Sequence, residues 1–329
     1  MLQGLAILAM VWLHLFDRRD FAGLFQPLIF IREIPLSFYV AQLSDFCVFC
    51  FAFCSGYAHM SLFGEEHFYK RRLKGLLKLL IQYAFVVVLF SGIGLLTGQG
   101  NLIPGSFLEF LGNITLINVS YNGAWWYMWA YVLLVLLSPL ILYTVKKTKP
   151  WIILIAGFVI YCGAFVLRFK VPTSNYFLQR LGPFGMTLYE YVLGCVCFKA
   201  GFISKTYKQW EKLPAWGRIS ISIVLLISLL AARTLLIPSL FFAPLSGAVI
   251  MMLFHFWKKP AVVKKSFLFF GKHSTNIWLT HMFFYLTLFK DHVYIARFPL
   301  AIYCYMLLIT VAVSYILIFM EKPILKRIP

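Results

Sequence analysis

Long apolar runs, separated by short stretches that carry most of the charges, dominate the chain. A helix needs roughly 20 apolar residues to cross a hydrocarbon core about 30 Å thick. Ten runs approach that length: residues 1–16, 41–62, 76–97, 125–145, 151–167, 183–199, 217–232, 239–257, 271–289 and 298–320. The pattern predicts an all-α polytopic membrane protein, with about ten transmembrane helices in a single domain over residues 1–329. Because only residues 233–238 interrupt the run from 217 to 257, eight to eleven spans also fit.

The first run, residues 1–16, is expected to be a membrane span rather than a signal peptide. No basic stretch precedes it and no small-residue cleavage site follows it. The run is short for a span, which leaves open a start further upstream.

The composition agrees with a membrane protein and excludes most soluble classes. Hydrophobic residues make up 62% of the 329 positions and charged residues 12%, which is too apolar for a soluble domain. The net charge of +19 is distributed in short clusters between apolar runs, so we expect no nucleic-acid binding. The seven cysteines lie in or beside apolar runs, where they pack as small hydrophobic residues, and no metal site is expected.

The distribution of Lys and Arg predicts how the chain is oriented in the membrane. Connections after the second, fourth, sixth and eighth runs, together with the C-terminal tail, hold 20 of the 30 Lys and Arg residues. The opposite connections hold nine, and one lies inside the third run. Because basic loops are retained in the cytoplasm, both termini are expected there, and His14 is expected in the outer half of the membrane.

Gln3 and His14 are the polar positions of interest in the first run. At about 100° and 1.5 Å per residue, eleven steps return to within roughly 20° of the same face, about 16 Å further along. An ionisable group inside an apolar span is costly without a partner or a water-filled cavity, so His14 is a functional candidate. The alternative is a packing histidine that is hydrogen-bonded to a neighbouring backbone.

Three further ionisable residues inside apolar runs are candidates for the site: His281, Asp45 and Glu190. His281 follows the start of the ninth run by about ten residues, at a depth comparable to that of His14. Asp45 lies at the outer end of the second run, at a depth from which its carboxylate could orient His14, although a surface position at a helix end explains it equally well. Glu190 lies in the sixth run.

Small, aromatic and basic residues supply the remaining candidates. Ser55 and Gly56 permit close approach of either another helix or a ligand chain. Three roles explain the basic cluster Lys70–Lys74: it sets the membrane topology, contacts lipid headgroups, or binds the phosphates of a ligand. Trp125 opens the fourth run at the outer interface, where aromatic residues are common.

Five blocks follow one another along nearly the whole chain. They are Gly4–Leu8 with His14, Phe51–Tyr57 followed by Arg71 and Arg72, Trp125–Tyr127 leading to Leu137–Leu140, Ser274–His281, and Glu321–Pro323. In this order and at these membrane depths, the blocks resemble the membrane-bound acyltransferase-3 family, which O-acylates surface polysaccharides, lipopolysaccharide, peptidoglycan and small sugars. The family pattern has a basic residue, ten intervening residues and the catalytic histidine; here His14 fits, and Gln3 stands where the basic residue would be.

The resemblance implies an O-acyltransferase, with acetyl-CoA or another acyl-CoA as the cytoplasmic donor. The acceptor would be a hydroxyl of an extracytoplasmic or lipid-linked glycan, and the protein would lie among the lipids of a bacterial plasma membrane. His14 would act as general base or carry the acyl group, with His281 in support. The donor would contact Gln3, Ser55, Tyr57, Lys70, Arg71 and Arg72, and the substrate path would pass Trp125, Trp126 and Glu190.

The chemical structure of acyl-CoA agrees with these positions of the basic cluster and His14. Acyl-CoA joins a polyanionic head to a thioester through a long arm, so it needs cations at one depth and a base roughly half a bilayer deeper. Two alternatives belong to other classes: a transporter or flippase of a lipid-linked sugar, and an acyltransferase-like protein without activity. Inverted repeats and paired broken helices, which would favour a transporter, are not apparent.

Overall fold

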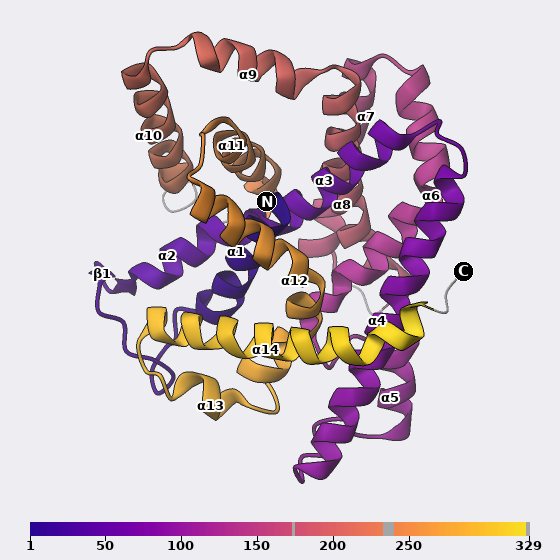
Figure 1. Cartoon of the computed structure of the whole chain (residues 1–329), viewed down its shortest axis with the longest axis vertical. Helices are drawn as coiled ribbons and strands as arrows, with labels where there is room; N and C mark the ends of the chain where they lie inside the picture. Colours follow the sequence, from indigo (N-terminus) through magenta and orange to yellow (C-terminus); the bar gives the residue numbers. More distant parts are fainter. Residues whose placement is uncertain (173–174, 233–239, 327–329) are drawn as a thin grey trace.

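Helices make up nearly all the regular structure of the computed structural model, which describes residues 1–172, 175–232 and 240–326 (Figure 1). Within these described residues, six helical segments are long and apolar enough to cross a membrane: Leu36–Leu62, Phe68–Leu96, Gly123–Lys147, Pro150–Phe169, Tyr176–Lys199 and Pro299–Lys326. Three shorter apolar helices are α1 (Leu2–Phe16), α10 (Ala215–Ala231) and α11 (Ala243–Phe256). The all-α polytopic architecture is therefore confirmed, while the count of ten spans stays a prediction.

Each predicted run falls on a helix, but several helices begin earlier than the run. The remaining long helices are α3 (Cys47–Leu62, preceded by α2 at Leu36–Leu43 and η1 at Ser44–Phe46), α4 (Phe68–Leu96), α6 (Trp126–Lys147, preceded by η2 at Gly123–Trp125), α7 (Pro150–Phe169), α8 (Tyr176–Lys199), α12 (Ala261–Tyr285) and α14 (Pro299–Lys326). Helix α4 starts eight residues before the run at 76, and α12 ten residues before the run at 271. Hydropathy marks the apolar stretch, whereas the helix continues through polar turns as long as its backbone groups bond internally. The predicted connection at 233–238 and residue 239, the first of the next run, lie outside the described residues.

The connections contain elements that the apolar runs did not predict. Helix α9 (Phe202–Lys212) lies across one end of the molecule, at the top of Figure 1. Its apolar residues are mixed with lysines, so it has no continuous apolar run. Short helices α5 (Phe107–Ile114) and α13 (Lys290–Tyr294) and a hairpin of β1 (Phe30–Ile31) with β2 (Ile34–Pro35) complete the chain, and η4 (Leu240–Phe242) precedes α11.

Helix α8 packs along α3 and α7, and α1 packs against α12 and α3. Glycines bring the backbones of α3 and α8 into direct contact. A Cβ atom at Gly56 would overlap the carbonyl of Tyr191, and one at Gly194 would overlap the carbonyl of Phe53. Gly56 therefore serves helix packing, whereas its neighbour Ser55 lines a cavity.

Replacing Gly194 with alanine is expected to destabilise the protein, because the added methyl group has to push α8 away from α3. Overpacking of this kind costs about 1–3 kcal/mol. Thermal unfolding in detergent measures it as a lowered midpoint. The matched control is Gly92→Ala on α4, where nothing lies within 4 Å of the new Cβ. Equal midpoints for the two variants would contradict the close α3–α8 contact.

Candidate active site

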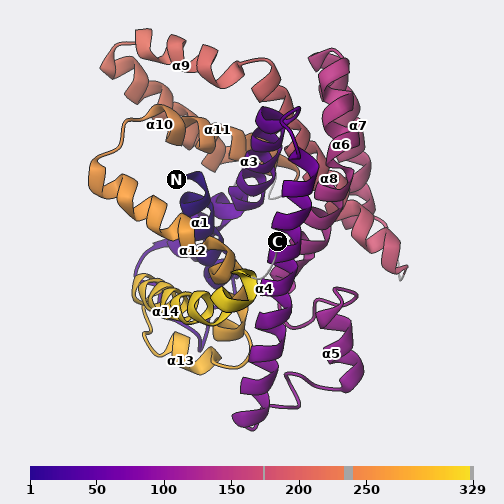
Figure 2. The ribbon, with the colours of Figure 1, turned by 45° about the vertical axis from the view of Figure 1, so that its right-hand side comes forward.

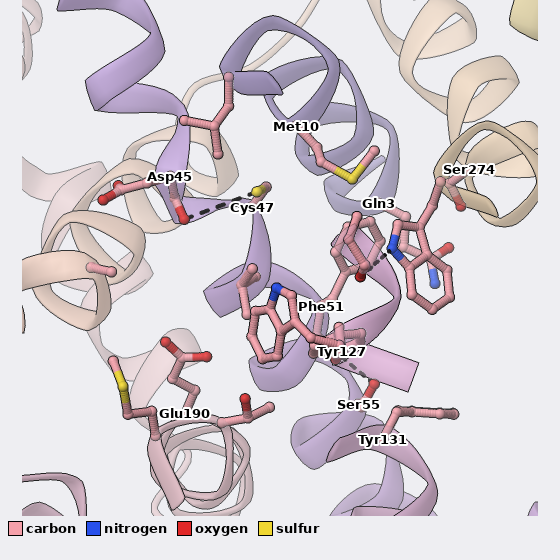
Figure 3. Close-up of a pocket in the computed structure, with 18 of the residues that line it drawn as sticks. Gln3, Met10, Asp45, Cys47, Phe51, Ser55, Tyr127, Tyr131, Glu190 and Ser274 are labelled. Carbon is pink, nitrogen blue, oxygen red and sulfur yellow. Dashed lines mark hydrogen bonds between the residues drawn. The ribbon is translucent and has the colours of Figure 1, made fainter. Parts of the chain in front are cut away.

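A cavity of about 310 Å³ lies between helices from both halves of the chain. Its walls come from α1, η1, α3, α4, η2, α6, α7, α8, α11 and α12, and Figure 3 shows polar side chains around it on several sides. Six of the predicted site residues line it together: Gln3, His14, Asp45, Ser55, Trp126 and Glu190. Gln3 and His14 lie on this wall because α1 is one regular helix and the two positions share a face.

His14 belongs to a small aromatic cluster with two residues of α12. The ring of His281 meets the His14 ring edge-on, with centroids 5.0 Å apart. The Tyr285 hydroxyl lies 3.4 Å from His14 Nδ1, and its ring stacks on His281 at 6.0 Å. Because Tyr285 engages Nδ1, Nε2 is the His14 nitrogen that is left to meet a substrate.

His281 is completely buried, and its own hydrogen bond defines its tautomer. Its Nδ1 lies 2.9 Å from the Trp278 carbonyl oxygen, which can only accept, so Nδ1 donates the hydrogen. The neutral ring then carries no hydrogen on Nε2, which is buried without a hydrogen-bond partner among the described residues. This ring can support His14 by packing, but it has no hydrogen to offer at Nε2.

Asp45 and Glu190 are both buried on the cavity wall, 5% and 4% exposed. Asp45 lies in η1, between α2 and α3, and Glu190 lies near the middle of α8. His14 meets Tyr285 and His281, so the structure brings Asp45 to the same cavity without an Asp45–His14 hydrogen bond. The orienting role of Asp45 stays a prediction.

Two predicted residues are packed away from the cavity. Trp125 is fully buried, donates from Nε1 to the Leu279 carbonyl at 3.2 Å and meets Tyr83 edge-on at 4.7 Å. Tyr57 packs edge-on against Phe198 at 5.2 Å. Both therefore hold helices together in this structure, and Trp126, next in sequence to Trp125, is the tryptophan of the pair that reaches the cavity.

The basic cluster lies at the start of α4, outside the cavity lining. Lys70 is exposed, and Arg71 forms an ion pair with Glu65 at 2.6 Å on the surface. Arg72 is half-buried, with its guanidinium over the Phe68 ring at 5.9 Å and its Nε buried without a hydrogen-bond partner among the described residues.

Sequence reasoning missed several polar groups of the site. Tyr285 follows His281 by four residues, one helical turn, so it could have been found on the same face of α12. In the sequence, Arg168 contributes only to the count of Lys and Arg that predicts membrane orientation. In the structure, it lines the cavity from the last turn of α7. No cluster of three or more metal-ligating side chains occurs in residues 1–172, 175–232 and 240–326.

Comparison with known proteins identifies the family of the chain. Residues 1–319 match the model of the acyltransferase-3 family, which is described as an acyltransferase domain. No curated protein and no solved structure matches the chain. The matched region includes every helix that lines the cavity, from α1 to α12.

Proposed function

The chain belongs to the acyltransferase-3 family and is a multi-pass membrane acyltransferase, and on this premise we propose that it acylates a glycan across the membrane. The donor is cytoplasmic acyl-CoA, with acetyl-CoA as the first candidate. The acceptor is a hydroxyl of an extracytoplasmic or lipid-linked glycan, and the membrane is a bacterial plasma membrane. The observation that carries the proposal is the cavity that joins Gln3, His14, Ser55 and Trp126.

In the proposed reaction His14 is the general base. Its Nε2 accepts the proton of the acceptor hydroxyl while the oxygen attacks the thioester carbonyl. A new C–O bond forms, the C–S bond breaks, and the departing CoA thiolate takes the proton from the His14 imidazolium. His281 and Tyr285 act as positioning residues, because they hold the ring and engage Nδ1. In the covalent variant, His14 itself carries the acyl group before transfer.

Turnover of labelled acetyl-CoA tests the proposal directly. Membranes that contain the protein should release CoA and transfer the label to the glycan fraction. Flux of a lipid-linked sugar without loss of the thioester would instead support a transporter. Mass spectrometry of surface glycans from a deletion strain would then identify the acceptor and the acyl chain.

The basic cluster is proposed to hold the CoA phosphates, so its loss should weaken donor binding. Arg71→Ala or Arg72→Ala is expected to raise the KM for acetyl-CoA by about 10- to 100-fold, since a charge-assisted hydrogen bond contributes about 1.5–3 kcal/mol. Steady-state kinetics in membranes or nanodiscs measures this. Lys290→Ala on α13, far along the chain from the cluster, is the control. If the KM for acetyl-CoA is unchanged in both arginine variants, the cluster does not bind the donor and only sets the orientation of the chain in the membrane.

A further inference from the structure

Besides the His14 cluster, the cavity has a second polar region where α7 and α8 meet α6. Glu190 of α8 lies there together with Thr187 on the same helix and Arg168 of α7. Glu190 is 4% exposed, and its Oε2 is buried without a hydrogen-bond partner among the described residues. Figure 3 shows its carboxylate pointing from α8 into the space that the lining residues enclose.

Arg168 does not neutralise this carboxylate by direct contact. The ion pairs among the described residues are Arg71–Glu65 and His67–Glu66. The Arg168 guanidinium lies over the Trp126 ring instead, with Cζ 4.8 Å from the ring centroid. The structure therefore keeps a cation and a carboxylate on one cavity wall without pairing them, beside the apolar surface of a tryptophan.

A second buried polar group on the same cavity, the Tyr127 hydroxyl, also lacks a hydrogen-bond partner among the described residues. An unsatisfied buried polar group costs about 1–3 kcal/mol, and a charged one costs more, above all at membrane depth. Glu190 and Tyr127 thus provide an acceptor and a donor that only a bound molecule or water can satisfy, and the Arg168 guanidinium lines the same cavity.

The chemistry of these groups selects the kind of ligand. The Glu190 oxygen needs a hydrogen donor, the Arg168 guanidinium needs acceptors, and the Trp126 ring offers an apolar surface. A pyranose supplies all three, because its ring hydroxyls donate and accept and its C–H groups form an apolar face. The cavity wall holds two acidic side chains, Glu190 and Asp45, against one basic side chain, Arg168, so an acidic sugar or a phosphate would add a further negative group to it, and like charges in a buried interface cost several kcal/mol.

We infer that Glu190, Arg168 and Trp126 form the acceptor subsite, which binds the ring of a neutral sugar and presents one of its hydroxyls to the reaction. The inference rests on the proposed function and adds the class of acceptor and the residues that select it. Glu190 accepts a hydrogen bond from a ring hydroxyl, Arg168 donates to a second ring oxygen, and Trp126 packs against the ring.

The test uses the full-length protein in nanodiscs, acetyl-CoA, and two soluble probes, methyl N-acetyl-β-glucosaminide and methyl β-glucuronide. Mass spectrometry follows the acetylated glycosides. We expect transfer to the neutral probe to exceed transfer to the acidic one. Glu190→Gln should raise the KM for the neutral probe by about 10- to 100-fold, the range for a lost hydrogen bond to a charged group, and shift the KM for acetyl-CoA less than twofold. Glu211→Gln on the exposed face of α9 is the matched control and should leave both KM values unchanged.

Three other kinetic results would overturn the inference. An unchanged glycoside KM in Glu190→Gln would show that the carboxylate does not meet the sugar. A raised KM for acetyl-CoA alone would assign the region to the donor arm, and preference for the glucuronide would assign it to acidic acceptors. If the wild type does not cleave acetyl-CoA at all, the proposed function fails. In that case photolabelling with a diazirine analogue of the neutral glycoside decides separately: label on peptides of α6–α8 that Glu190→Gln weakens supports the subsite, and its absence rejects it.

Discussion

Replacing His14 with alanine is expected to lower acyl transfer by at least about 100-fold, because removal of a general base costs about 10²- to 10⁴-fold in the chemical step. The variant loses the whole imidazole, including Nε2, the nitrogen that Tyr285 leaves open to a substrate. Transfer of label from acetyl-CoA to the glycan fraction, measured at equal amounts of membrane-inserted protein, gives the result. A loss of packing would instead lower stability and the amount of inserted protein.

The control experiments separate chemistry from folding. His14→Gln keeps a polar side chain on the cavity wall but no base, so it should be as inactive as His14→Ala and unfold near the wild-type temperature. His292→Ala, at an exposed histidine of α13, should keep full activity. Normal glycan acylation in cells that express His14→Ala at the wild-type level would reject the mechanism.

Cysteine labelling is expected to give an all-or-none result for two positions: Lys74, near the start of α4, and Asn118, beyond α5. Helix α4 has 29 residues, about 44 Å in length, so its ends can reach opposite sides of a membrane. The turn from α3 lies at one end and α5 at the other (Figure 2). An impermeant maleimide applied to intact cells should label a cysteine at Asn118 and leave one at Lys74 unmodified, because the charge bias places 63–75 in the cytoplasm.

The background for this experiment lacks the seven native cysteines. Both positions are exposed in the folded chain, so failure to react reports the membrane side rather than burial. Permeabilised cells, in which both positions should react, provide the control. The reverse pattern would invert the protein and place Arg71 outside, which is incompatible with a cytoplasmic acyl-CoA donor.

The opposite orientation of the two positions has a mechanistic consequence. If 63–75 is cytoplasmic and 98–124 is outside, then CoA and the acceptor approach the cavity from different sides. The acyl group then crosses the bilayer while the rest of the cofactor stays in the cytoplasm. The donor KM in the Arg71 and Arg72 variants and the acceptor KM in Glu190→Gln therefore report on opposite ends of one reaction path.

The sequence alone determines the class of this protein, because the bilayer imposes a length and a composition on every span. Apolar runs identify all the long helices, and the resemblance of five ordered blocks agrees with the family match over residues 1–319. The sequence also places Gln3 and His14 on one face of α1, since the geometry of a single helix follows from local hydrogen bonding. Where a helix begins is less certain from sequence, as α4 and α12 show, because polar turns can continue a helix beyond its apolar stretch.

Only the tertiary structure decides which polar side chains share a cavity. Trp125 and Trp126 are neighbours in sequence, yet one is buried in the packing and the other lines the cavity, because Trp125 ends η2, Trp126 begins α6, and successive residues of such helical turns point in directions about 100–120° apart. Glu190 and Arg168 come together because α7 and α8 pack against each other. Such contacts join residues that are distant along the chain, and they depend on the fit between whole helix surfaces, which no local pattern of apolar and polar residues records.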